Sequence, residues 1–271
     1  LPLSAFGTFC NSVINGQQQY QRYVSLGMIS VVLSTCAMLS MIYFYGVEGA
    51  LLAASVQGAL VGAVMLIFNV RQPWFKIQYW WGSADKEARR DIGNYILMAV
   101  TSSITVPIAL IVIRNMLISN VGWVSTGQWQ AIWKISEVYL GVITLSLGTY
   151  YLPRLSSLTK TQDIIKEIHK TSLVVIPIAC SLALIVYFFR DVIITVLFTD
   201  EFRDARELFL IQLVGDVVKV ASWLYAFTMI SKGAVKWFVF SEIVFSVLFV
   251  LLSYVFIDWY GVKGVSLAYL I

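Results

Sequence analysis

Residues 45–53 read Tyr-Gly-Val-Glu-Gly-Ala-Leu-Leu-Ala, and residues 260–268 read Tyr-Gly-Val-Lys-Gly-Val-Ser-Leu-Ala. Six of the nine positions are identical, and the two copies are 215 residues apart. Each copy lies beside long apolar runs, and its glycines are typical of a tight turn. The repeat therefore predicts two similar turns between helices, with chance similarity of apolar segments as the alternative.

The composition of the chain places it in a lipid bilayer. Of its 271 residues, 59% are hydrophobic and only 13% are charged, and the mean hydropathy is +0.80. A soluble domain is about half apolar and about a quarter charged, so a soluble globular enzyme is excluded. The apolar residues form long runs instead of alternating, which excludes a β-barrel. The sequence predicts an all-α polytopic membrane protein.

A transmembrane helix needs about 20 apolar residues to cross roughly 30 Å of hydrocarbon. Seven segments have this length, and two partial spans flank them. The full spans are 24–45, 49–70, 92–118, 128–152, 171–189, 206–231 and 233–257, and the partial spans are 1–15 and 262–271. Because both ends lie inside apolar runs, we expect a fragment of a longer protein. The polar segment 155–170 is expected to form a short helix on the membrane surface.

Lysine and arginine residues predict which loops face the cytoplasm. One alternating set of loops holds 12 of them and the other set holds 4. The basic set, expected to be cytoplasmic, is 16–23, 71–91, 153–170 and 231–236. The turns of the repeat fall in the other set, on the outer side of the membrane.

The spacing of the repeat predicts the architecture. Six spans separate the two copies, and an even number gives both copies the same orientation. This is typical of transporters built from two parallel six-helix lobes. Residues 1–70 would then end the N-terminal lobe, 71–91 would form the cytoplasmic inter-lobe linker, and 92–271 would form the C-terminal lobe, truncated in its last helix. Gly58 and Gly62 form a GxxxG pair, which predicts close helix packing.

Six ionisable side chains fall inside the spans. They are Arg114, Lys134, Glu137, Asp216, Lys219 and Glu242. Each costs about 2.5–3.5 kcal/mol at the bilayer centre, so each should face the protein interior or water. Lys134 and Glu137 share a face with other polar and small residues, and Gln212 shares a face with Asp216 and Lys219. These polar faces predict a shared hydrated cavity between the lobes.

A structural role is the alternative for several of these charges. Opposite charges spaced i, i+3, as in Lys134–Glu137 and Asp216–Lys219, can neutralise each other. Arg114 can extend toward the membrane surface. No motif for catalysis, nucleotide binding or a cofactor occurs, and the three cysteines lack metal-binding spacing. Active transport would therefore draw on an ion gradient, with Glu137, Asp216 and Glu242 as candidate coupling groups.

Several stretches resemble Wzx-type flippases, which export lipid-linked O-antigen and enterobacterial common antigen units. They are Gln-Leu-Val-Gly-Asp-Val-Val-Lys-Val at 212–220, Tyr-Leu-Pro-Arg-Leu-Ser at 151–156, Trp-Gln at 129–130, Val-Glu-Gly-Ala-Leu-Leu at 47–52, and the segment 190–209. The resemblance implies a MATE-like fold of six plus six helices. It also implies that the protein moves an undecaprenyl-pyrophosphate-linked oligosaccharide from the cytoplasmic to the periplasmic leaflet of the bacterial inner membrane.

The resemblance also implies roles and partners. Arg114, Lys134 and Lys219 would bind the pyrophosphate-bearing substrate together with Gln212, although the role of Lys134 rests on its helix face alone. The partners would be the lipid bilayer, a polysaccharide polymerase and a chain-length regulator, with no nucleic acid. A cation-coupled exporter of small molecules, of the MATE or major-facilitator type, is the alternative. A MATE-type drug exporter would favour an acidic cavity, and a major facilitator usually carries a Gly…Asp-Arg-x-Gly-Arg loop that is missing from 153–170.

Overall fold

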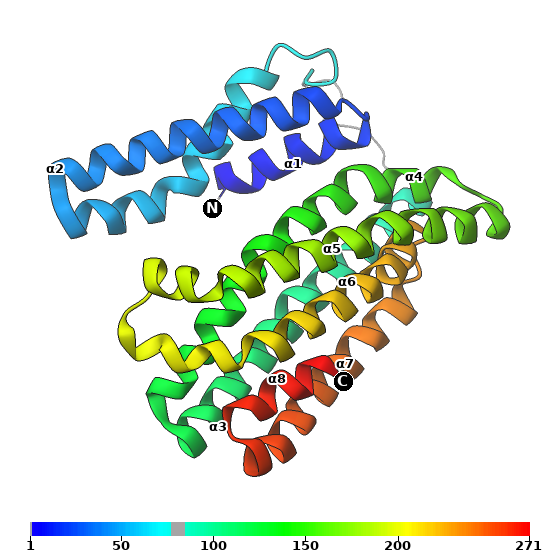
Figure 1. The fold of residues 1–271 in the computed structure, drawn as a ribbon. Helices are drawn as coiled ribbons and strands as arrows, with labels where there is room; N and C mark the ends of the chain where they lie inside the picture. Colours follow the sequence, from blue (N-terminus) through cyan, green and yellow to red (C-terminus); the bar gives the residue numbers. More distant parts are fainter. Residues whose placement is uncertain (1, 77–84) are drawn as a thin grey trace. The chain divides into compact units, whose positions relative to one another are not determined.

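The computed structural model describes residues 2–76 and 85–271, and nearly all of them are helical (Figure 1). Their contacts divide the chain into two compact units, Leu1–Ala84 and Asp85–Ile271, which are described separately. Part of the predicted inter-lobe linker, residues 77–84, lies outside the described residues. The linker and the two six-helix lobes remain predictions.

The first unit is made of two helices, α1 (Pro2–Gly16) and α2 (Tyr20–Asn69). The long helix α2 is interrupted at Gly46 and folds into a hairpin, drawn in blue shades in Figure 1. Its second half packs closely on α1, because a Cβ atom placed on Gly62 would lie 1.8 Å from the carbonyl oxygen of Leu3. A Cβ atom on Gly58 would lie 3.2 Å from the Cβ atom of Ser4. The close packing predicted from the GxxxG pair is therefore confirmed.

The second unit begins with the long helix α3, which is interrupted at Gly122. Its elements are α3 (Lys86–Ser146), the π-helix η2 (Leu147–Tyr151), α4 (Leu152–Ser157), α5 (Thr161–Leu197), the 3-10 helix η3 (Asp200–Glu207), α6 (Phe209–Ser231), α7 (Val235–Tyr260) and α8 (Val262–Leu270). Two clusters of buried side chains hold these helices together. One surrounds Trp129 and Phe209, and the other surrounds Leu140 and Leu224.

Five continuous helical stretches among the described residues are long and apolar enough to cross a membrane. Two of them each contain two predicted spans, on either side of the breaks at Gly46 and Gly122. The chain is thus an all-α polytopic membrane protein, as predicted.

The predicted surface helix over 155–170 is wrong. Helix α4 ends at Ser157, and α5 then runs without a break from Thr161 to Leu197. Leu158 and Lys160 have extended backbones, with ψ angles of 131° and 132°, and separate the two helices. No glycine or proline lies between Thr161 and the apolar span that follows, so nothing in the sequence stops the helix.

The two copies of the sequence repeat adopt the same backbone conformation. Gly46 has φ 57° and ψ −133°, and Gly261 has φ 56° and ψ −136°. These angles are costly for any residue with a side chain, so each turn depends on its glycine. A short repeat that arose by chance between apolar segments would not be expected to reproduce a turn so closely.

A second glycine in each copy permits a close approach of backbone to backbone. A Cβ atom on Gly49 would lie 2.0 Å from the carbonyl oxygen of Met41, and one on Gly264 would lie 2.1 Å from that of Phe256. Met41 and Phe256 are themselves 215 residues apart, as are the two glycines. The repeat therefore encodes both the turn and the contact that closes it.

Alanine at Gly49 or Gly264 should destabilise the protein because the new methyl group would collide with a backbone carbonyl group that cannot move freely. We expect a loss of about 1–3 kcal/mol at either position. Gly27→Ala is the matched control, because a Cβ atom there meets nothing within 4 Å. Thermal unfolding of the full-length protein in detergent measures the effect. Equal stability of the Gly27, Gly49 and Gly264 variants would contradict the close contact.

Candidate functional site

Asp216 on α6 forms the centre of a polar cluster inside the second unit. Its side chain is completely buried, with 0% of its surface exposed. The Oδ2 atom accepts hydrogen bonds from the hydroxyl groups of Ser136 and Tyr139 on α3, both at 2.6 Å. The Oδ1 atom accepts a hydrogen bond of 2.8 Å from the hydroxyl group of Tyr269 on α8 and a longer one, 3.4 Å, from Gln212.

These contacts explain how a carboxylate can be buried among membrane helices. A buried charge is very costly unless hydrogen bonds replace its water shell. Hydrogen bonds to an ionised oxygen are short and roughly twice as strong as neutral ones. Because the donors come from α3, α6 and α8, the carboxylate of Asp216 also links three helices.

Gln212 lies in the same cluster, one helical turn before Asp216. Its side chain is 1% exposed. The amide nitrogen donates to Asp216, and the amide oxygen accepts a hydrogen bond of 3.5 Å from the hydroxyl group of Ser266. The structure therefore places this predicted substrate-binding residue against the carboxylate.

Lys219 also lies on α6, but its ammonium group contacts aromatic rings. The Nζ atom is 5.1 Å from the ring centre of Tyr269, 5.2 Å from that of Trp133 and 5.6 Å from that of Trp223. Within residues 2–76 and 85–271, Lys219 has no ion pair within 4 Å. The Asp216–Lys219 ion pair that the i, i+3 spacing permitted is therefore not formed.

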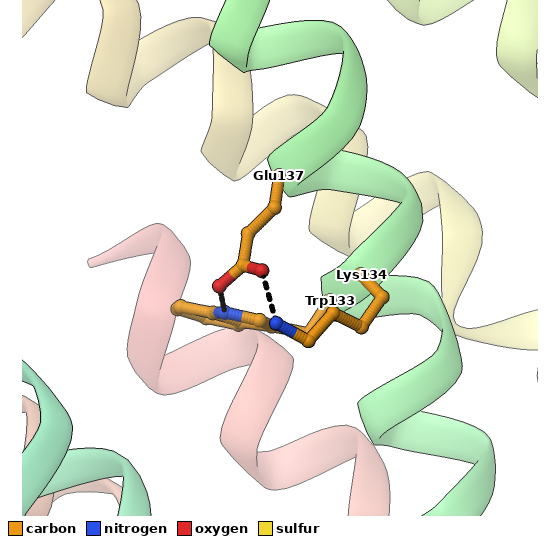
Figure 2. A network of polar contacts seen from close by, with 3 residues as sticks. All are labelled: Trp133, Lys134 and Glu137. Carbon is orange, nitrogen blue, oxygen red and sulfur yellow. Dashed lines mark hydrogen bonds and ion pairs between the residues drawn. The ribbon is translucent and has the colours of Figure 1, made fainter. Parts of the chain in front are cut away.

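Lys134 and Glu137 do form the ion pair that their i, i+3 spacing permitted. The Nζ atom of Lys134 lies 2.5 Å from the Oε2 atom of Glu137, and the indole nitrogen of Trp133 donates to Oε1 at 2.9 Å. Figure 2 shows how both side chains converge on the carboxylate of Glu137. The side chains of Lys134 and Glu137 are 64% and 46% exposed. Trp133 links this pair to the cluster, since its ring also lies beneath the ammonium group of Lys219.

The two remaining predicted residues lie on other parts of the unit. Glu242 on α7 is partly buried. Its charge, together with those of Asp216 and Glu137, acts on Lys219. Arg114 on α3 is partly buried, and its Nε atom has no hydrogen-bond partner in the described part of the chain.

The structure therefore brings Gln212, Asp216 and Lys219 into one region of the second unit, with Lys134 and Glu137 joined to it through Trp133. Among the described residues, no group of three or more His, Cys, Asp and Glu side chains is arranged to hold a metal ion. The second unit therefore contains the ammonium group of Lys219 beside neutral rings, with carboxylates at longer range.

Sequence reasoning missed the hydroxyl groups that surround Asp216. Tyr139 and Ser136 lie 77 and 80 positions from Asp216 in the chain, and Tyr269 lies 53 positions from it. Single polar residues at such separations carry no periodic signal. The buried carboxylate itself was the available clue, because it requires donors from neighbouring helices.

Removal of one of the hydroxyl groups that donate to Asp216 should lower the free energy of unfolding. Ser136→Ala leaves a buried charged oxygen with one hydrogen bond fewer, at a cost of about 1–3 kcal/mol. Ser146→Ala on the same helix is the matched control, because its exposed hydroxyl group only contacts the carbonyl oxygen of Val142. Thermal unfolding in detergent compares the two variants, and equal melting temperatures would show that the cluster contributes no stability.

Two curated proteins are similar to this chain over most of its length. The Lipid III flippase of Escherichia coli (strain K12) and the Lipid III flippase of Shigella flexneri are each 32% identical to it over 225 residues, or 83% of the chain. The aligned stretch is 54% of each relative, so the chain spans about half the length of the curated relatives it matches. No protein-family model and no solved structure matches the chain. By sequence, this chain of apolar helices is thus similar to proteins named Lipid III flippases.

Proposed function

We propose that the full-length protein is a transporter of the bacterial inner membrane that moves an undecaprenyl-pyrophosphate-linked oligosaccharide from the cytoplasmic to the periplasmic leaflet. The oligosaccharide would be a repeat unit of O-antigen or enterobacterial common antigen. The observation that carries this proposal is the 32% identity to Lipid III flippases across 83% of the chain. The helical stretches that are long enough to cross a membrane agree with it.

The cations of the second unit would bind the substrate. A pyrophosphate carries at least two negative charges, and its removal from water is costly unless it is paired. Lys219 suits this task because its ammonium group has no acidic partner within 4 Å among the described residues. Arg114 would add charge, Lys134 would contribute only when the substrate displaces its ion pair with Glu137, and Gln212 would contribute through its hydrogen bond to Asp216.

The carboxylates Glu137, Asp216 and Glu242 would couple transport to a proton or cation gradient. Each lies inside a span, where an ionisable group is costly and usually functional. Glu137 and Asp216 accept hydrogen bonds from Trp133 and Tyr269, and the rings of these two residues lie beside the ammonium group of Lys219. This connection supports a link between ion movement and substrate binding.

The whole protein would have a MATE-like arrangement of six plus six helices. Residues 1–70 would end the N-terminal lobe, 71–91 would link the lobes, and 92–271 would belong to the C-terminal lobe. The matching turns at Gly46 and Gly261 support this arrangement, since internal repeats are common in transporters. A polysaccharide polymerase and a chain-length regulator would act on the exported product.

Reversal of the cationic charges should abolish transport. In a strain without its own flippase, Arg114→Glu and Lys219→Glu should fail to restore the polysaccharide ladder, because a negative side chain repels the pyrophosphate. Arg114→Lys should keep part of the activity, since it retains the charge but loses the planar fork. Lys236→Glu is the control, because this exposed lysine lies near the start of α7.

The amount of each variant in the membrane must be measured alongside the ladder. A full ladder from both Arg114→Glu and Lys219→Glu at normal abundance would overturn the proposed cationic mechanism. If Lys236→Glu reduced the polysaccharide ladder by the same amount, any charge reversal would disturb the protein.

A further inference from the structure

Tyr269 on α8 contacts both charged groups of the site. Its hydroxyl group donates to the Oδ1 atom of Asp216 at 2.8 Å, and its ring centre lies 5.1 Å from the Nζ atom of Lys219. The same ring packs edge-on against Trp133, with ring centres 5.1 Å apart and an interplanar angle of 66°. One side chain therefore lies against the carboxylate and the ammonium group at the same time.

The carboxylate that Tyr269 contacts already has a full set of donors. Ser136 and Tyr139 occupy its Oδ2 atom, and Tyr269 with Gln212 occupies its Oδ1 atom. An oxygen that accepts short hydrogen bonds gains less from a further donor. The hydroxyl groups thereby satisfy Asp216 without Lys219, although the two residues are close enough along the helix to form a pair.

The ammonium group of Lys219 is held in a different way. Aromatic faces attract a cation through their quadrupole, and the attraction is stronger where water is partly excluded. The rings of Trp133, Trp223 and Tyr269 are neutral, so they stabilise the ammonium group without cancelling its charge. A carboxylate at ion-pair distance would cancel that charge and weaken its attraction for any other anion.

We propose that Tyr269 is a positioning residue that keeps Asp216 and Lys219 apart, so that Lys219 is presented to an anionic, pyrophosphate-type headgroup. The rings of Trp133, Trp223 and Tyr269 together form an aromatic cage around the ammonium group. The inference rests on the proposed function and deepens it, because it assigns a role in substrate recognition to residues without charge.

The test measures binding of farnesyl pyrophosphate to the purified full-length protein in detergent by calorimetry. Tyr269→Phe keeps the ring but removes the hydroxyl group, so the carboxylate of Asp216 should form an ion pair with Lys219. Binding should weaken roughly tenfold, which corresponds to about 1.4 kcal/mol. Tyr254→Phe is the matched control, because Tyr254 on α7 is 61% exposed. Farnesol, which has no pyrophosphate, separates headgroup binding from binding of the lipid tail.

A second variant distinguishes positioning from a general loss of stability. In Tyr269→Phe/Asp216→Asn, residue 216 is neutral and cannot form an ion pair with Lys219, so binding should return toward the wild-type level. Transport should stay low, because a carboxylate proposed to couple ions is gone. Trp223→Leu should weaken binding, since the cage loses one ring.

The outcomes separate this inference from the proposed function. If the wild-type protein binds farnesol and farnesyl pyrophosphate equally, anion recognition fails, and the proposed function loses its mechanism. If the wild type binds the pyrophosphate but Tyr269→Phe binds it equally well, Tyr269 has no positioning role and the proposed function stands. If the double variant binds as weakly as Tyr269→Phe, the tyrosine has a structural role only, which also overturns the inference.

Discussion

The burial of the Asp216 carboxylate is the constraint on which the second unit depends. A fully buried charge requires donors at hydrogen-bond distance, and these come from α3 and α8 as well as from its own helix. The three helices must therefore approach one another closely at this point. Trp133 and Lys219 lie one turn from these contacts, so the cluster also sets the position of the aromatic cage and of the ammonium group within it.

Two pairs with the same spacing show what local sequence can and cannot predict. Lys134–Glu137 forms an ion pair and Asp216–Lys219 does not, although both are i, i+3 pairs of opposite charge on a helix. The donors to Glu137 come from its own helix, whereas the three shortest hydrogen bonds to Asp216 come from residues more than 50 positions away. The spans and the turn at Gly46 were predictable because apolar runs and glycines act locally. The hydroxyl groups around Asp216 depend on tertiary packing, which one sequence does not reveal.

The charged groups of the second unit differ in how strongly they can attract an anionic substrate. The Lys134–Glu137 pair is exposed and neutral overall, so it attracts an anion weakly at a distance. The ammonium group of Lys219 lies among neutral rings, with no acidic side chain within 4 Å in the described part of the chain. A cation kept in this way suits a phosphate-bearing headgroup better than the cationic substrates of a MATE-type drug exporter. The similarity to Lipid III flippases and the physical chemistry of the cluster thus favour the same class of cargo.

The role of Lys219 is best tested by a structure of the full-length protein with an undecaprenyl-pyrophosphate-linked oligosaccharide. We expect phosphate oxygens in contact with the ammonium group of Lys219, the rings of Trp133, Trp223 and Tyr269 still around it, and Asp216 still bound by hydroxyl groups. A pyrophosphate bound elsewhere, with Lys219 paired to Asp216, would contradict it.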